Sequence, residues 1–109
     1  MTTIKYYIDH RGQSPVTNFL DKNLQIKNKA SIIINNIKKY GLISIIPNIK
    51  RLTKLPLWEI RIMGKNSSRI LFATKKDDLV ILLHAFKKKS MKTPPKEIKI
   101  ALKRLNQLP

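Results

Sequence analysis

The chain has 109 residues, and 23 lysine and arginine residues against six aspartate and glutamate residues give it a net charge of +17. Hydrophobic residues make up 42% of the sequence, enough for a core, so the composition is not that of a disordered basic tail, and the length suits one domain over residues 1–109. The absence of cysteine excludes disulfides, thiol catalysis and cysteine-bound zinc. Neither a signal-peptide pattern nor an apolar run near the ~20 residues of a membrane span is present, so we expect a soluble cytoplasmic protein with no membrane partner.

The positive charge is spread over the whole chain and is densest between Lys87 and Arg104. Such an excess repels itself and is typical of proteins that bind a polyanion. Nucleic acid is the first candidate, while membrane surfaces and heparin-like polyanions stay open. The many isoleucine, lysine and asparagine residues also indicate AT-rich codon usage, which would account for part of the charge.

The first half of the chain predicts one strand followed by two helices. Residues 4–8 are β-prone, and Ser14 with Pro15 has the pattern of an N-cap followed by the first helical position. Apolar residues at helical spacing predict a second helix over about 25–40, which Gly41 would end. We expect these two helices to form a hairpin.

The second half changes to a strand pattern after an irregular stretch, 42–56, which we interpret as a connection. Three strand-like runs separated by short turns cover residues 57–63, 69–74 and 79–86. Thr93 and Pro94 then repeat the cap-plus-proline signal and begin a C-terminal helix. The order β-α-α-β-β-β-α predicts a small α+β domain with an antiparallel sheet.

The motifs of several enzyme classes are missing. The sequence contains no glycine-rich phosphate loop, no nucleophile elbow and no cluster with metal-ligand spacing. With six carboxylates in the chain, a two-metal nuclease centre is hard to assemble. We therefore expect no metal and no cofactor, and any chemistry on nucleic acid would have to proceed without a metal.

Charged residues interrupt the predicted sheet at three positions. Alternation along residues 57–63 places Glu59 and Arg61 on the face opposite Trp58, and Arg69 begins the next strand. A cross-strand salt bridge from Glu59 to either arginine would be a purely structural explanation. Arginine also binds phosphate through a planar fork of donors, so a role in phosphate binding is compatible with that explanation.

His84 lies near the end of the last predicted strand, just before Lys87, Lys88 and Lys89. A lone histidine of this kind is more often a partly buried hydrogen-bonding group than a catalyst. It is still the better acid–base candidate of the two histidines in the chain. The positive charge nearby should lower its pKa and favour the neutral base.

Four segments, in this order and spacing, resemble the HigB-like branch of the RelE/ParE toxin superfamily. They are 57–62 (LWEIRI), 68–72 (SRILF), 82–89 (LLHAFKKK) and 92–98 (KTPPKEI). Members of this superfamily are toxins of bacterial type II toxin–antitoxin systems, many of them phage-derived. The resemblance covers about 57–105 and implies a microbial-RNase-like domain with an N-terminal helical hairpin and a C-terminal helix on an antiparallel sheet.

The resemblance also implies an activity and its partners. Such toxins are metal-independent endoribonucleases that enter the ribosomal A site and cut mRNA, which stops translation. A base assists the attack of the RNA 2′-hydroxyl on its phosphate, cations stabilise the transition state, and an acid protonates the leaving oxygen. The implied partners are a HigA-like helix-turn-helix antitoxin, the ribosome and mRNA.

Residue roles follow from the resemblance position by position. The implied catalytic residues are Arg69, His84, Lys88 and Lys89. The residues expected to contact RNA are Arg61, Lys87, Lys92 and Lys96. His84 could be the base or a structural hydrogen-bonding group. Several relatives use a tyrosine or histidine near the C-terminus, but none follows His84 here, so the identity of the general base stays open.

Two other functions stay open at this point. A ParE-like toxin of the same fold would poison gyrase and cause DNA damage without cutting RNA. A non-catalytic nucleic-acid-binding module would release its ligand with rising salt and form no cleavage product.

Overall fold

The computed structural model describes residues 1–64, 67–76, 78–89 and 91–108. Within these residues the chain forms five strands, three α-helices and one 3-10 helix. In chain order they are β1 (Thr3–Tyr6), α1 (Pro15–Asp21), α2 (Leu24–Tyr40), the 3-10 helix η1 (Leu42–Asn48), β2 (Ile49–Arg51), β3 (Trp58–Ile62), β4 (Ser68–Lys75), β5 (Leu79–Lys87) and α3 (Pro95–Asn106). No helix among the described residues is both long and apolar enough to cross a membrane.

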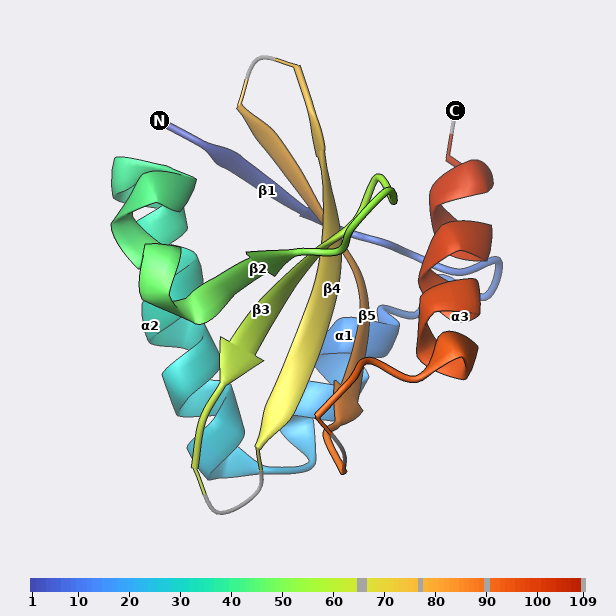
Figure 1. Cartoon of the computed structure of the whole chain (residues 1–109), viewed down its shortest axis with the longest axis horizontal. Helices are drawn as coiled ribbons and strands as arrows, with labels where there is room; N and C mark the ends of the chain where they lie inside the picture. Colours follow the sequence, from blue (N-terminus) through green and yellow to red (C-terminus); the bar gives the residue numbers. More distant parts are fainter. Residues whose placement is uncertain (65–66, 77, 90, 109) are drawn as a thin grey trace.

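All five strands form one sheet in the order β1-β5-β4-β3-β2 (Figure 1). Strands β2 to β5 pair in an antiparallel manner, which confirms the predicted meander of the last three strands. The sheet is nevertheless mixed, because β1 pairs with β5 in a parallel manner. The helical hairpin carries the chain across one face between β1 and β2, so β1 lies at the opposite edge of the sheet from β2.

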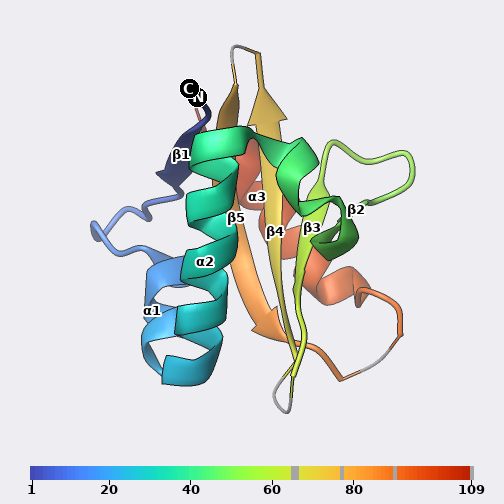
Figure 2. The ribbon, with the colours of Figure 1, turned by 90° about the vertical axis from the view of Figure 1, so that its left-hand side faces the viewer.

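The sheet separates two apolar layers. The α1–α2 hairpin covers one face and α3 covers the other (Figures 1 and 2). Ile60 and Ile62 of β3 belong to the hairpin layer, whereas Leu57 and Leu71 belong to the α3 layer. This distribution confirms the predicted alternation along β3 and the α+β fold of the domain.

Two of the three predicted helix signals are confirmed. Ser14 accepts a hydrogen bond from the Thr17 amide, and Pro15 is the first residue of α1. Gly41 ends α2 with φ +80°, a conformation that favours glycine. Thr93, in contrast, is not the N-cap of α3, because Pro94 occupies that position and the Thr93 hydroxyl instead donates a hydrogen bond to Glu59 Oε2.

The predicted connection over 42–56 contains two short elements, η1 and β2. Ile49, Lys50 and Arg51 of β2 pair with β3 and extend the sheet by one edge strand. A run of three residues carries no readable alternation, and its hydrogen bonds depend on β3, so the sequence pattern missed this strand. This edge strand carries Lys50 to the side of β3.

Candidate functional site

One open groove of about 600 Å³ contains half of the predicted site residues. We call it the basic groove; its lining residues are Lys50, Glu59, Arg61, Met63, Ser67, Arg69, Lys88, Lys89 and Met91. These residues come from β2, β3, the connection between β3 and β4, β4 and the segment after β5. Of the predicted site residues, Arg61, Arg69, Lys88 and Lys89 therefore lie together.

Strand register explains why these distant positions meet. Arg61 of β3 pairs directly with Arg69 of β4 in the antiparallel ladder. The Lys88 amide donates a hydrogen bond of 2.9 Å to the Ser67 carbonyl, which continues the pairing of β4 with β5 beyond the end of β5. The basic side chains thus converge where β3 ends and β4 begins.

A buried ion pair lies at the floor of the basic groove. Glu59 is 1% exposed and Arg69 is 6% exposed, and Arg69 Nε lies 3.0 Å from Glu59 Oε1. Arg69 Nη1 also donates a hydrogen bond to the Ser68 carbonyl at 3.1 Å. Of the two predicted cross-strand salt bridges, the one between Glu59 and Arg69 is therefore confirmed. Because Arg69 also lines the groove, the pair is compatible with phosphate binding.

The Glu59 carboxylate interacts with two further residues. Its Oε2 accepts a hydrogen bond from the Thr93 hydroxyl, and its Oε1 lies 4.0 Å from Lys88 Nζ. Burial lowers the pKa of Lys88, and the nearby cations Arg69, Lys50 and Arg61 lower it further, against the opposing effect of Glu59. Lys88 therefore releases its proton more readily than an exposed lysine.

Arg61 is anchored at the rim of the groove. Its Nη2 donates a hydrogen bond of 3.0 Å to the Pro47 carbonyl of η1. This contact fixes part of the guanidinium while the side chain stays partly exposed to the groove. Lys50 and Lys89 are exposed. Flexible exposed lysines beside two anchored arginines form a surface that can bind a chain of phosphates.

His84 does not line the basic groove but lies between β5 and α3. Its Nε2 is 2.8 Å from Glu97 Oε1, and its Nδ1 is 3.2 Å from Arg104 Nη1. Arginine can only donate, so Nδ1 accepts, and the proton of neutral His84 lies on Nε2, from which it is donated to Glu97. Arg104 also donates to the Leu83 carbonyl at 2.9 Å. Both ring nitrogens therefore take part in attaching α3 to the sheet.

The predicted lowering of the His84 pKa is confirmed, but the main cause differs from the expected one. Burial lowers the pKa of His84 first, and Arg104 lowers it further, while Glu97 acts in the opposite direction. The lysine run after β5 is not among these causes.

The other predicted RNA contacts are more scattered. Lys87 lines a cavity of about 210 Å³ together with Phe19 and Ile26 of the hairpin, outside the basic groove. Lys92 lies in the segment between the groove and α3, and Lys96 is an exposed residue of the first turn of α3. The structure thus places none of the three among the lining residues of the basic groove.

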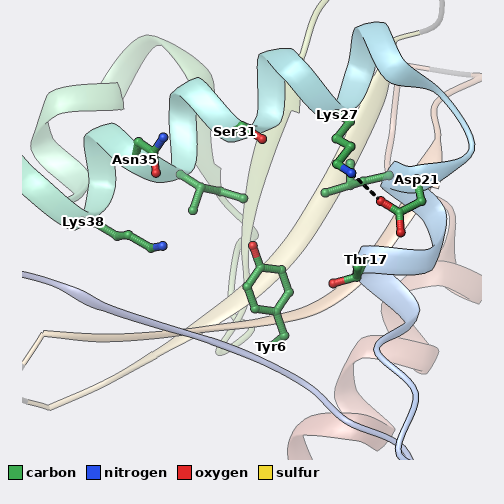
Figure 3. Close-up of a pocket in the computed structure, with 9 residues that line it drawn as sticks. Tyr6, Thr17, Asp21, Lys27, Ser31, Asn35 and Lys38 are labelled. Atoms are coloured by element: carbon green, nitrogen blue, oxygen red, sulfur yellow. Dashed lines mark ion pairs between the residues drawn. The ribbon is translucent and has the colours of Figure 1, made fainter.

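A different cavity of about 220 Å³ lies between β1 and the helical hairpin (Figure 3). Tyr6, Ser31 and Asn35 line it, beside a 2.9 Å ion pair between Asp21 and Lys27. Burial raises the pKa of Tyr6. None of the predicted site residues lines this cavity.

Sequence reasoning missed part of the basic groove. It placed Lys50 in a connection, treated Glu59 only as an ion-pair partner and assigned Thr93 to a helix cap. The one available signal was Glu59, an acidic residue within an apolar strand of a very basic chain. Among the described residues, no three histidine, cysteine, aspartate or glutamate side chains gather in a way that could hold a metal.

Most of the chain matches a family model. Residues 14–106 match a family model described as "Phage derived protein Gp49-like (DUF891)". A search of curated proteins found no match. The matched range extends from the N-cap of α1 to the end of α3 and therefore includes every residue that lines the basic groove.

Proposed function

The chain belongs to the Gp49-like family of phage-derived proteins, and from this premise we propose that it is an mRNA-cleaving toxin of a type II toxin–antitoxin system. The family is associated with toxin–antitoxin systems and is related to RelE-like toxins. Within that group we assign the chain to the HigB-like branch on its four sequence segments.

The observation that carries the proposal is the basic groove. Five cationic side chains line it: Lys50, Arg61, Arg69, Lys88 and Lys89. These cations repel one another, and a bound anionic ligand would relieve that repulsion, so the groove favours such a ligand. The phosphodiester backbone of a nucleic acid carries a row of negative charges, and a single strand of RNA fits an open groove.

The proposed chemistry is transfer of the phosphodiester to the neighbouring 2′-oxygen. That oxygen loses its proton to a base and bonds to phosphorus, and the bond from phosphorus to the 5′-oxygen breaks. Arg69 and Arg61 would stabilise the negative charge that builds up on the phosphoryl oxygens. Lys88, whose pKa is lowered, would donate a proton to the departing 5′-oxygen.

The proposal includes two kinds of partner. The ribosome would present mRNA to the groove, and the exposed lysines around it would contact ribosomal RNA. A HigA-like helix-turn-helix antitoxin would neutralise the toxin. With a net charge of +17 on the toxin, we expect an acidic surface on that antitoxin.

The test is to express the protein in bacteria and to map the 5′ ends of cellular transcripts. The wild type should create new ends within translated messages and stop growth. Lys88→Ala combined with Lys89→Ala should remove these ends. Lys75→Ala combined with Lys76→Ala is the matched control, because it removes the same charge at the opposite end of β4.

Unchanged transcripts with normal growth would contradict the proposal. Unchanged transcripts with poisoned gyrase in a supercoiling assay would instead indicate a ParE-like toxin. Salt-sensitive RNA binding without any cleavage product would indicate the non-catalytic binding module.

A further inference from the structure

We infer that Glu59 and Thr93 are positioning residues that hold Arg69 and Lys88 in the geometry needed for cleavage. The inference rests on the proposed ribonuclease function and assigns a part of the site that the sequence did not reveal. Neither residue is expected to touch the reacting atoms.

Glu59 is buried at the floor of the groove. A carboxylate that is 1% exposed is costly unless its oxygens are paired. Both are engaged here: Oε1 lies 3.0 Å from Arg69 Nε, and Oε2 accepts the hydrogen bond from Thr93. A base must reach the proton that it removes, so a covered carboxylate with both oxygens engaged is poorly suited to be the general base. It is well suited to hold cations in place.

Two contacts set the orientation of Arg69. The contact at Nε and the hydrogen bond from Nη1 to the Ser68 carbonyl attach the guanidinium at two points. Because the guanidinium is planar, two attachments fix its plane and therefore the direction in which its remaining donors point. A phosphate-binding group that is oriented before the substrate arrives stabilises the transition state better than a mobile one.

Thr93 directly precedes Pro94, the N-cap of α3. Its hydroxyl connects the segment before α3 to the floor of the groove on β3. Lys88 Nζ lies 4.0 Å from the other oxygen of the same carboxylate. One buried side chain thus organises groups from β4, from the segment after β5 and from the segment before α3.

The variant Glu59→Gln distinguishes a positioning role of Glu59 from a role as general base and from a purely structural role. The amide keeps the size of the side chain but removes its charge, so Arg69 and Lys88 lose their shared partner. Misplacement of a catalytic group by about 1 Å can cost about a hundredfold in rate, so we expect kcat to fall by about tenfold to a hundredfold. The affinity for RNA should stay equal or rise, since a negative charge leaves a cationic groove.

The experiment measures RNA cleavage on translating ribosomes and, separately, the binding of a fluorescent single-stranded RNA to the full chain. Glu59→Gln and Thr93→Val should lower kcat without weakening binding, and Thr93→Ser should restore the rate. The wild-type rate should fall toward low pH, because the base that accepts the 2′-hydroxyl proton is then already protonated. This fall should persist in Glu59→Gln. Asp21→Asn and Thr74→Val are matched controls, since both positions are exposed and lie outside the groove.

Several outcomes would overturn the inference. Loss of the low-pH fall in rate in Glu59→Gln would make Glu59 the general base. If Thr93→Val lowered kcat and RNA binding equally, and Thr93→Ser did not restore them, the hydrogen bond between Thr93 and Glu59 would have only a structural role. Wild-type rates in both variants would overturn this inference alone, whereas a wild type that cuts no RNA would overturn it together with the proposed function.

Discussion

Two polar clusters lie on the α3 face of the sheet and are built from similar residue types. The groove cluster consists of Glu59, Arg69, Lys88 and Thr93. The helix cluster consists of His84, Glu97 and Arg104, with the Arg104 guanidinium 5.4 Å from the centre of the Tyr7 ring. Each cluster has one carboxylate that interacts with basic groups.

The clusters differ in what their basic groups face. In the groove cluster, Arg69 and Lys88 line an open groove together with other cations. In the helix cluster, His84 is engaged at both ring nitrogens by groups of α3. Residue type alone therefore does not make a candidate site. His84 has the chemistry of a catalyst, but its ring holds α3 against the sheet.

Among substitutions in the two clusters, Arg69→Ala should have the largest effect on the rate of RNA cleavage. Loss of one donor to a developing negative charge costs about a hundredfold to a thousandfold in rate. Glu59 would also lose its closest cation while buried, which destabilises a protein by about 3–5 kcal/mol. Cleavage assays and chemical denaturation measure the two effects.

A paired variant separates the activity of Arg69 from its role in stability. Replacing both partners, Arg69→Met with Glu59→Leu, should restore much of the stability, because neither member of the buried pair is left without the other. It should not restore cleavage. A folded Arg69→Ala variant that cuts RNA at the wild-type rate would remove the main distinction between the two clusters.

Lys88→Arg should have an intermediate effect. The wild-type rate should fall as the pH rises through the lowered pKa of Lys88, because the proton donor is lost. Arginine keeps its proton at any working pH, so the variant should be slower by about tenfold or more but should lack this fall at high pH. A rate profile over pH measures both features, and an unchanged high-pH limb would exclude Lys88 as the acid.

His84→Gln should have the smallest effect on cleavage and a measurable effect on stability. Loss of its hydrogen bonds leaves Glu97 and Arg104 poorly satisfied, which costs about 1–3 kcal/mol. Because the pKa of His84 is lowered in the folded state, the unfolded chain binds more protons as the pH falls below about 6.5. The stability advantage of the wild type should therefore be full above that pH and shrink below it.

Denaturation curves between pH 5 and pH 8 measure this difference (a range of about 1.5 pH units on each side of the free histidine pKa). His10→Gln is the control, because His10 is exposed. If folded His84→Gln protein lost cleavage altogether, the helix cluster would belong to the catalytic machinery.

Much of the fold could be predicted because its signals are local. Ser14 and Pro15 mark the start of α1, and Gly41 marks the end of α2, through backbone preferences that need no tertiary partner. The alternation of Glu59 and Arg61 with apolar neighbours correctly assigned the two faces of β3. Strand β2 and the parallel pairing of β1 were missed, because both depend on which strand lies beside them.

The candidate site was predictable only in part, for a related reason. Arg61, Arg69, Lys88 and Lys89 were identified through their place in sequence segments, and the structure brings them to one groove. The role of Thr93 was missed, because its sequence pattern fits an N-cap equally well. Only the tertiary structure shows that Glu59 lies within reach of Thr93, so that the Thr93 hydroxyl donates a hydrogen bond to Glu59 instead of capping α3.

By itself, the sequence determined the charge, the apolar pattern of each element and the residues available for binding an anion. The tertiary structure decided which of those residues meet. A register shift between Leu71 and Phe72 leaves Leu83 as an extra residue in β5, so His84 pairs with Leu71 on the α3 face instead of following Leu82 onto the hairpin face. Hydrogen bonding between strands sets that register, and it places His84 beside Glu97, while Arg69 and Lys88 lie in the groove.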